Sequence, residues 1–320
     1  MSQRALCVTG NLALRKVLRR TLSAAGTTVE FVDRCEDLLT LEGPPVDLLV
    51  VDDVANAGAL PEILPRLGPA AKVVLLGGPF DAATTLDVMR QDGVDHLLGT
   101  DGELEEQEIV VTSVKLLRGD LLGVEKYLTW GAQLHCRKVA SYDEKRVAIR
   151  EVTELAREMG CRRQLVARVE TVTDELLMNA LYDAPASRYG CRPLFQGKGR
   201  PGAGPVTDQV AELRFGCDGR YFAVAVRDAF GELRKSNILD HLERARDEKG
   251  LPKIGGEEGG GGGLGLYFIL NSVSRFIANI EPGKATEVIC LFDLRGGARD
   301  YFYRAKSLSI FVGQPAVKAA

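Results

Sequence analysis

Short apolar runs alternate with amphipathic stretches along the first 120 residues of this 320-residue chain. The runs that fit buried strands are Ala5–Val8, Val29–Val32, Asp47–Val51, Lys72–Leu76 and His96–Leu98. The stretches that have the spacing of amphipathic helices are Leu12–Ala25, Cys35–Leu41, Pro61–Leu67, Ala82–Gln91 and Leu104–Leu117. This alternation predicts an α/β domain built on a doubly wound, five-stranded parallel sheet. Ligands of such sheets bind at the carboxyl ends of the strands.

The rest of the chain predicts a joint and a second α/β domain. An amphipathic stretch from Glu105 to about Leu128 predicts a long helix that leaves the first domain, and we expect the only tryptophan, Trp130, to pack at the joint. A further helix is predicted from about Asp143 to Met159. The domains expected are therefore 1–120, a helical joint at 121–140, a second domain at 141–298, and a C-terminal strand and tail at 299–320.

A glycine-rich segment, Gly259–Leu266, runs without a break into the apolar stretch Tyr267–Leu270. The first amide groups of a helix are unpaired and point outward, and glycine lets a ligand approach that backbone closely. Together with the helix dipole, this arrangement favours an anion such as phosphate. The alternative is a flexible linker that happens to precede a helix.

Two further segments carry polar side chains in positions that suit a nucleotide. Glu175 and Asn179 are four residues apart in a helical pattern, so they lie on one face and offer hard oxygen ligands for magnesium. The strand-like segment Tyr221–Val226 leads to Asp228 and Gly231, and a carboxylate at a strand end can accept a hydrogen bond from the amine of a base. The alternative for the first segment is a solvated Glu-Asn pair on the surface of a helix, and the alternative for the second is an ordinary Asp-Gly turn.

In this order, the three segments resemble the ATP-binding domain shared by histidine kinases, anti-sigma-factor kinases, gyrase, a heat-shock chaperone and MutL. The resemblance covers roughly residues 140 to 295 and implies an α/β sandwich. The matching residues are Glu175 and Asn179 in the N-box, Asp228 and Gly231 in the adenine box, Gly261, Gly263, Leu264, Gly265 and Leu266 in the glycine box, and Thr286 before the last strand. Phe230 and Glu232 depart from the pattern, because the family has glycine at both positions.

The resemblance implies ATP and magnesium as cofactors. It implies that Asn179 binds the magnesium ion, either without Glu175 or together with it. It implies that Glu175 is the catalytic base and that a lid covers the nucleotide at residues 232–260. In the helical hairpin of a typical histidine kinase, the phosphorylated histidine is followed directly by an acidic residue. His135 is instead followed by Cys136 and Arg137, so this hairpin is missing, and the layout looks closer to anti-sigma-factor kinases. Those enzymes phosphorylate serine or threonine of a protein partner; the alternative is slow ATP hydrolysis.

The first domain resembles a response-regulator receiver domain with Asp52 at the phosphoacceptor position. The residues that support phosphorylation in that family are missing. Thr9-Gly10-Asn11 stands where a carboxylate pair holds magnesium, and Gly99 replaces the lysine that pairs with the phosphoryl group. We therefore interpret this domain as a pseudo-receiver with a degenerate phosphoacceptor, serving for docking to a protein or for homodimerisation.

Composition narrows the function classes. A net charge of −3 gives no sign of a nucleic-acid surface. No apolar run approaches the ~20 residues needed to span a bilayer. The seven cysteines are scattered without a Cys-x-x-Cys pair, which is typical of reduced thiols in a cytoplasm. The leading hypothesis is a cytoplasmic signalling protein that binds ATP with magnesium and phosphorylates or regulates a protein partner. The rival is a non-catalytic scaffold that binds nucleotide or nothing.

Overall fold

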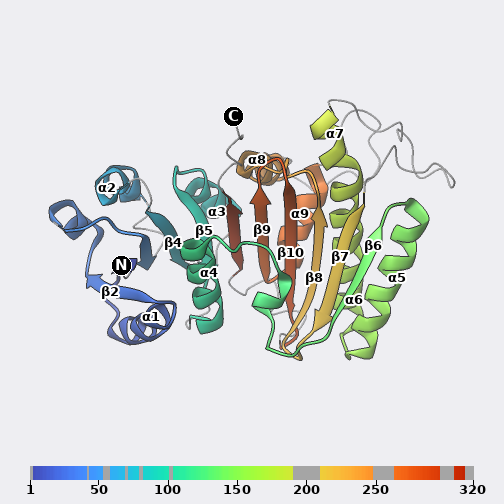
Figure 1. Ribbon diagram of the computed structural model, residues 1–320, viewed down its shortest axis with the longest axis horizontal. Coiled ribbons are helices and arrows are strands. Elements are labelled where there is room, and N and C mark those ends of the chain that lie inside the picture. The colour runs from blue at the N-terminus through green and yellow to red at the C-terminus, as the bar shows by residue number, and fades with distance from the viewer. Residues whose placement is uncertain are drawn as a thin grey trace. The chain divides into compact units, whose positions relative to one another are not determined.

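The computed structural model describes residues 3–41, 43–52, 58–68, 71–78, 82–100, 104–189, 210–247, 263–295 and 306–313. The chain divides into two compact units, each with its own strands and helices (Figure 1). The first unit comprises Met1–Leu121 and Tyr303–Phe311, and the second comprises Leu122–Phe302 and Val312–Ala320. Both units mix helices and strands, so the predicted α/β class is confirmed.

The first unit contains the predicted parallel strands, in the order β2-β1-β3-β4-β5. Their bounds are β1 Gln3–Val8, β2 Thr27–Val32, β3 Leu48–Asp52, β4 Lys72–Gly77 and β5 Val94–Gly99. This is one of the two common orders of doubly wound sheets, and it places the switch point between β1 and β3. Strand β3 is buried along four of its five residues, as expected when helices cover both faces.

The helical elements of this unit begin and end close to their predicted positions. They are α1 Leu12–Ala24, the 3₁₀ turn η1 Cys35–Thr40, α2 Leu60–Leu67, α3 Ala82–Met89 and α4 Glu106–Arg118. Helices α1 and α4 pack together and cover one face of the sheet, where Leu18, Leu22 and Ile109 are fully buried against alternate strand residues. The spacing of apolar residues in the sequence therefore located this core.

A sixth strand, β11 (Ser307–Val312), comes from the C-terminal part of the chain and pairs antiparallel with β5. Its side chains at Leu308, Ile310 and Phe311 are almost fully buried. The sequence predicted a strand in this region but gave no sign of its partner. The first unit is thus assembled from two segments that are separated in the sequence by Leu122–Phe302 of the second unit.

The predicted helical joint is wrong. Helix α4 ends at Arg118 because Gly119 adopts the left-handed conformation, with φ of 72°, and closes the helix through a hydrogen bond to Lys115. A single 3₁₀ turn, η3 (Val124–Tyr127), follows. Trp130 does not pack against the chain, since its side chain is 97% exposed. Strand β6 (Leu134–Val139) follows near the end of the region.

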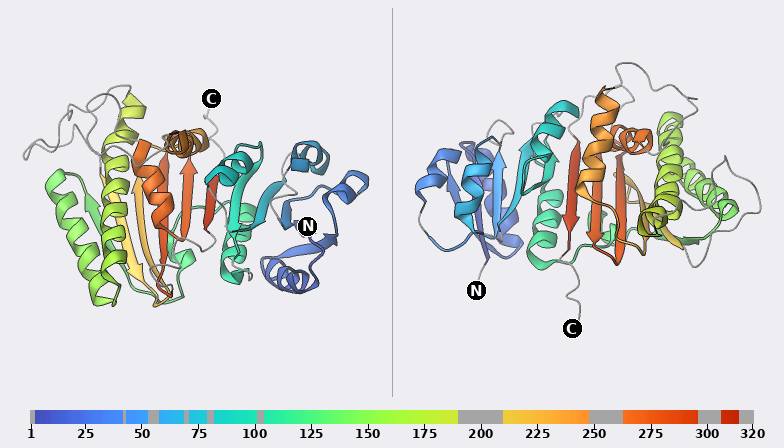
Figure 2. Two further views of the ribbon diagram at one scale, coloured as in Figure 1. Left: turned by 180° about the vertical axis from the view of Figure 1, so that it is seen from behind. Right: turned by 90° about the horizontal axis from the view of Figure 1, so that it is seen from above.

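The second unit has an antiparallel sheet in the order β9-β10-β8-β7-β6. The remaining strands are β7 Ala211–Cys217, β8 Tyr221–Asp228, β9 Arg275–Glu281 and β10 Ala285–Asp293. Helices α5, α6 and α9 lie on one face of this sheet (Figure 2). The helical elements are α5 Tyr142–Glu158, α6 Arg163–Met178, the π-helical segment η4 Asn179–Asp183, α7 Ala184–Tyr189, α8 Lys235–Asp247 and α9 Gly263–Ser272.

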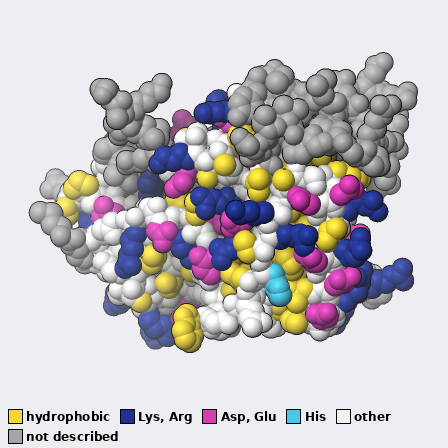
Figure 3. Space-filling view, turned by 45° about the vertical axis from the view of Figure 1, so that its right-hand side comes forward, with side chains coloured by type: hydrophobic (Ala, Val, Ile, Leu, Met, Phe, Trp, Pro, Cys, Tyr) yellow, Lys and Arg dark blue, Asp and Glu magenta, His cyan; other side chains and the backbone are white. Residues whose placement is uncertain are grey.

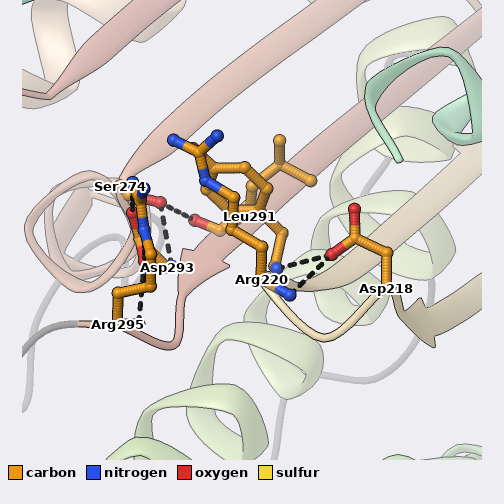
Figure 4. A network of polar contacts seen from close by, with 7 residues as sticks. Asp218, Arg220, Ser274, Leu291, Asp293 and Arg295 are labelled. Carbon is orange, nitrogen blue, oxygen red and sulfur yellow. Dashed lines mark hydrogen bonds and ion pairs between the residues drawn. The ribbon is translucent and has the colours of Figure 1, made fainter. Parts of the chain in front are cut away.

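Polar contacts fix one end of this sheet, at the start of β8 and the end of β10 (Figure 4). Asp218 accepts hydrogen bonds from the backbone amides of Arg220 and Tyr221 at 2.9 and 2.7 Å, and Asp293 pairs with Arg295 at 2.8 Å. Asp218 also accepts a hydrogen bond from the amide of Thr129, and these bonds hold its pKa below the ordinary value although burial opposes them. This end is therefore structural, and the opposite end carries the polar residues that the sequence singled out.

The described surface mixes charges of both signs. On the face shown in Figure 3, Lys and Arg side chains are interspersed with Asp and Glu and with small hydrophobic areas. Among the helices that the structure describes, none combines the length and the apolar character needed to cross a membrane.

Candidate functional site

Glu175 and Asn179 lie at the point where α6 changes its helical form. Glu175 is in the last turn of α6, and Asn179 is the first residue of the π-helical segment η4. A π-helical turn inside a helix is rare and occurs frequently at functional sites. The apolar residues Leu176 and Leu177 of this helix are buried, and η4 packs against β8. Packing of α6 and of η4 thus fixes the backbone of Glu175 and Asn179 on both sides of the point where the two segments meet.

The structure brings Glu175 to the glycine box. A Cβ atom placed on Gly265 would lie 2.1 Å from Oε2 of Glu175, so the carboxylate would have to move to make room for it. Gly265 is the third residue of α9, so the carboxylate occupies the space at the first turn of this helix that the missing side chain leaves open. A larger residue at this position would therefore displace the Glu175 carboxylate.

Burial is the main influence on Glu175 and raises the pKa of its carboxyl above the ordinary value. The neighbouring Asp174 and the more distant Asp183 raise this pKa further, whereas the ammonium group of Lys145 lowers it. Lys145 belongs to α5 and forms an ion pair with Asp174, with 2.6 Å between Nζ and Oδ1. A raised pKa with a specific charged neighbour is a common property of catalytic groups.

Asp228 lies at the end of β8 and shapes the turn that follows. Its Oδ1 accepts hydrogen bonds from the backbone amides of Phe230 at 2.8 Å and Gly231 at 3.3 Å, as the side chain of an Asx turn does. Asp228 is paired in register with Thr286 on the neighbouring strand β10. Asp228, which the sequence assigned to the base of a nucleotide, and Thr286, which it matched to the late threonine of the family, are therefore cross-strand neighbours.

The pair formed by Asp228 and Thr286 is buried. Burial raises the pKa of Asp228, and the surrounding amides of Phe230, Gly231 and Thr286 oppose this shift without cancelling it. The hydroxyl of Thr286 also lowers the pKa of Asp228, yet its oxygen forms no hydrogen bond of ordinary geometry among the described residues. A buried hydroxyl in this condition is open to a polar ligand.

Gly231 is required by the backbone around it. Its φ of 66° is in the left-handed region, and a Cβ atom there would lie 2.2 Å from the carbonyl oxygen of Glu281. Its own carbonyl accepts a hydrogen bond from the amide of Gly283, in the turn between β9 and β10. This close approach fixes the turn after Asp228 against the hairpin that presents Thr286.

One of the two residues that depart from the family pattern in the adenine box forms an ion pair. Glu232, which replaces a glycine, forms an ion pair with Arg188 of α7 at 2.9 Å. The Arg188 guanidinium also lies close to Gly283. This ion pair connects the helix that follows Asn179 to the turn that follows Asp228. The sequence gave no signal for it, because Arg188 lies in a polar stretch and Glu232 interrupts a motif.

Part of the glycine box is outside the described residues. Gly261 is outside them, as is the stretch 248–260 of the expected lid. Gly263 and Leu264 are the first two residues of α9, and Leu266 is buried. The prediction that the glycine-rich segment leads directly into a helix is confirmed for Gly263 onward.

In the first unit, Asp52, which the sequence placed at a degenerate phosphoacceptor position, is hydrogen-bonded to Thr9. The hydroxyl of Thr9 donates a hydrogen bond of 2.7 Å to Oδ2 of Asp52 across the switch point between β1 and β3. Asn11 caps α1 by accepting from the amides of Ala13 and Leu14. At the end of β5, the amide of Gly99 donates to the hydroxyl of Ser307 in β11. Each of these substituted positions therefore has a structural role.

Within the described part of the chain, no group of three or more His, Cys, Asp or Glu residues is placed to hold a metal ion. A magnesium ion at Asn179 would therefore need oxygen atoms from a bound phosphate and from water, as is common for this metal. The donor set of one amide and one neighbouring carboxylate fits magnesium bound in that way.

Comparisons with known proteins concern only the first unit. No family model matches the chain, and no curated protein matches it. A response regulator from Thermotoga maritima is similar to 37% of this chain over 99% of its own length, with 16% identity and a TM-score of 0.33. The signal receiver domain of an HD domain-containing protein from Pseudomonas fluorescens Pf-5 matches 37% of this chain and 88% of its own, with 17% identity and a TM-score of 0.31.

Proposed function

We propose that the second unit binds ATP with magnesium and uses it to phosphorylate or regulate a protein partner. The observation that carries this proposal is the buried pair at the ends of β8 and β10. Asp228 is 8% exposed, and the Thr286 hydroxyl beside it has no hydrogen-bond partner of ordinary geometry in the described structure. An adenine amine that donates to Asp228 and a ring nitrogen that accepts from Thr286 would satisfy both groups.

The other residues of the site fit the remaining parts of the nucleotide. Bound ATP supplies the phosphoryl group, and magnesium neutralises phosphate charge. Asn179 would hold the metal, and the amides at the start of α9 would face the phosphates. Glu175, beside that helix start, would orient the attacking hydroxyl of a serine or threonine, or a water molecule. Catalysis of this kind depends mainly on positioning and on charge stabilisation.

The first unit serves in this proposal as a pseudo-receiver for docking to the partner or for homodimerisation. The hydrogen bond from Thr9 to Asp52 supports this role, because it puts a hydroxyl beside Asp52 at a position where the receiver family has a metal-binding carboxylate. The proposed setting is a cytoplasmic signalling pathway, in which the partner is either the substrate or the regulated protein.

A second candidate function is a scaffold in which the nucleotide is bound without turnover, or not at all. The ion pair between Arg188 and Glu232 favours it, because it lies at a position where the resembling family has glycine. If this ion pair narrows the entrance to Asp228, nucleotide affinity falls and the unit acts through protein contacts alone.

Changing Asn179 to alanine tests the proposal. We expect this variant to lose ATP affinity in the presence of magnesium by at least about tenfold, because a metal ligand is removed. Its affinity for adenosine should change by less than about threefold, since adenosine carries no metal-bound phosphate. Titration calorimetry measures both affinities. Gln164→Ala, which removes an exposed amide from the same helix, is the matched control and should change neither.

Equal losses of ATP and adenosine in Asn179→Ala would contradict the assignment of this residue to the metal. If the wild-type protein binds neither ligand at millimolar concentration, the scaffold function is favoured instead.

A further inference from the structure

The ion pair between Arg188 and Glu232 joins two segments of the candidate site that are 44 positions apart in the sequence. Nη1 of Arg188 lies 2.9 Å from Oε1 of Glu232, and the two side chains are 48% and 19% exposed. Ion pairs this exposed contribute little to the stability of a fold, because water solvates the separated charges well. The feature that needs an explanation is therefore the location of this pair.

On one side of the ion pair, Arg188 belongs to the segment that begins with Asn179. The π-helical turn η4 starts at Asn179 and passes into α7 at Ala184, whose amide donates a hydrogen bond to the carbonyl of Asn179. Arg188 is the fifth residue of α7, and η4 packs against both α6 and β8. The backbone that carries the guanidinium is thus continuous with the backbone that carries the candidate metal ligand.

On the other side, Glu232 follows the turn that Asp228 fixes. The carbonyl of Gly231 in this turn accepts a hydrogen bond of 3.2 Å from the amide of Gly283, in the hairpin between β9 and β10. Arg188 reaches the same hairpin, since its Nη1 lies 3.9 Å from the position that a Cβ atom would take on Gly283. The guanidinium therefore lies against both of the turns that border the candidate base site.

We propose that the ion pair between Arg188 and Glu232 is a clasp, which sets the separation between Asn179 in the metal half of the site and Asp228 in the base half. A ligand that spans both halves gains from both only when their separation matches its length. This role rests on the proposed function for the identity of that ligand, whereas the connection between the two segments is a property of the chain itself. Arg188 and Glu232 are then positioning residues.

Reversing each charge of the clasp tests this role, because the two reversals change the charge of the site in opposite directions. We expect Arg188→Glu and Glu232→Arg each to weaken the binding of magnesium-ATP by at least about fivefold, since like charges push the two segments apart. Combining them restores an ion pair and should return the affinity to within about twofold of the wild type. Adenosine reaches only the base half and carries no charge, so its affinity should change by less than about twofold in all three variants. Titration calorimetry measures both ligands.

The matched control is Arg214→Glu. Arg214 of β7 forms an ion pair of 2.7 Å with Glu125 of η3, and neither element carries a residue of the candidate site. This reversal should leave the affinities for magnesium-ATP and adenosine unchanged, which would show that reversing an ion pair elsewhere in the unit does not disturb the site.

Three results would overturn the clasp. Weaker magnesium-ATP binding in Arg188→Glu with stronger binding in Glu232→Arg would mean that the charges act directly on the phosphates. Tighter binding of adenosine in both single variants would mean that the ion pair narrows the entrance to Asp228. Failure of the double variant to restore magnesium-ATP binding would mean that the two side chains do not act as a pair.

The clasp and the proposed function fail in different ways. If the wild-type protein binds neither ligand, the proposed function fails, and hydrogen exchange in the nucleotide-free protein still tests the clasp. We expect amides of residues 179–189 and 229–232 to exchange faster in both single variants and to return to the wild-type rate in the double variant. Unchanged exchange in the single variants would show that the ion pair does not hold the two segments together.

Discussion

Two carboxylates of the second unit have raised pKa values, and their surroundings differ in a way that matters for chemistry. Asp228 is enclosed by backbone amides that partly offset its burial, and it is locked into a turn. Glu175 has no such bonds, because the described residues give it no hydrogen bond. A locked carboxylate suits recognition of a ligand, whereas one without such bonds can move with a proton during a reaction.

Asp228→Asn should gain stability relative to the wild type as the pH rises. The asparagine Oδ1 can still accept from the amides of Phe230 and Gly231, so the main change is the loss of a buried charge. Because burial raises the native pKa, the wild-type protein keeps this proton to a higher pH than the unfolded chain, for which the ordinary value is 3.8. Wild-type stability therefore falls between 3.8 and the raised native pKa, and the variant avoids this loss.

Urea unfolding of both proteins across a pH series measures the difference. It should reach about 1.4 kcal/mol for each unit by which the native pKa exceeds the unfolded one. A difference that stays constant with pH, or that favours the wild type at high pH, would show that the carboxylate is not destabilised by burial.

At the scale of single elements, the ends of the strands decide what each sheet can do. The ends of β1 and β3 meet at the switch point of the first sheet, where a ligand site is expected. In this chain the hydrogen bond between Thr9 and Asp52 joins these ends. In the second unit, the end of β8 and the start of β10 place Asp228 opposite Thr286. The strand ends of the first unit are thus joined by a hydrogen bond between side chains, whereas those of the second unit carry a buried hydroxyl without a partner of ordinary geometry among the described residues.

The end of β3 should accept no phosphoryl group. Incubation with acetyl phosphate and magnesium is expected to leave the intact mass of the protein unchanged. The physical reason is that Asp52 is hydrogen-bonded to Thr9 and has no second carboxylate at Thr9-Gly10-Asn11 to hold the metal. Mass spectrometry of the wild type and of Asp52→Ala is the measurement. An adduct present in the wild type and absent from the variant would prove a working phosphoacceptor.

At the scale of the whole molecule, the first unit depends on the end of the chain. Strand β11 supplies Phe311, whose ring is tilted against that of His96 with centroids 4.4 Å apart, and the ammonium nitrogen of Lys115 lies 3.7 Å from the centroid of the Phe311 ring. The chain therefore leaves the first unit after Leu121 and contributes to it again from Tyr303. Formation of this unit involves contacts between residues that are about two hundred positions apart, and such contacts form slowly.

Phe311→Ala should destabilise the first unit by about 3–5 kcal/mol, the usual cost of removing a buried aromatic side chain. Val312→Ala, one residue further along the same strand and 54% exposed, should change stability by less than about 0.5 kcal/mol. Urea unfolding gives both values, and hydrogen exchange at Leu97 of β5 reports on the paired strand. Equal effects of the two substitutions would mean that β11 does not contribute to the core of this unit.

The sequence by itself determined the local features of this protein. The alternation of apolar runs located the five parallel strands, because strands that are buried on both faces must be apolar throughout. Spacing put Glu175 and Asn179 near one another, and the glycine-rich segment marked the start of α9. The ATP-binding role of these residues stays a prediction, since it came from a resemblance rather than from geometry.

Only the tertiary structure decided the features that join distant segments. It paired β11 with β5, placed an edge strand in the last part of the predicted helical joint, and left Trp130 exposed, because pairing and packing depend on partners that no local pattern identifies. It also brought Lys145 to Asp174, and Glu175 to Gly265. A lysine in an apolar stripe is visible in the sequence, but its meaning depends on which carboxylate the fold places beside it.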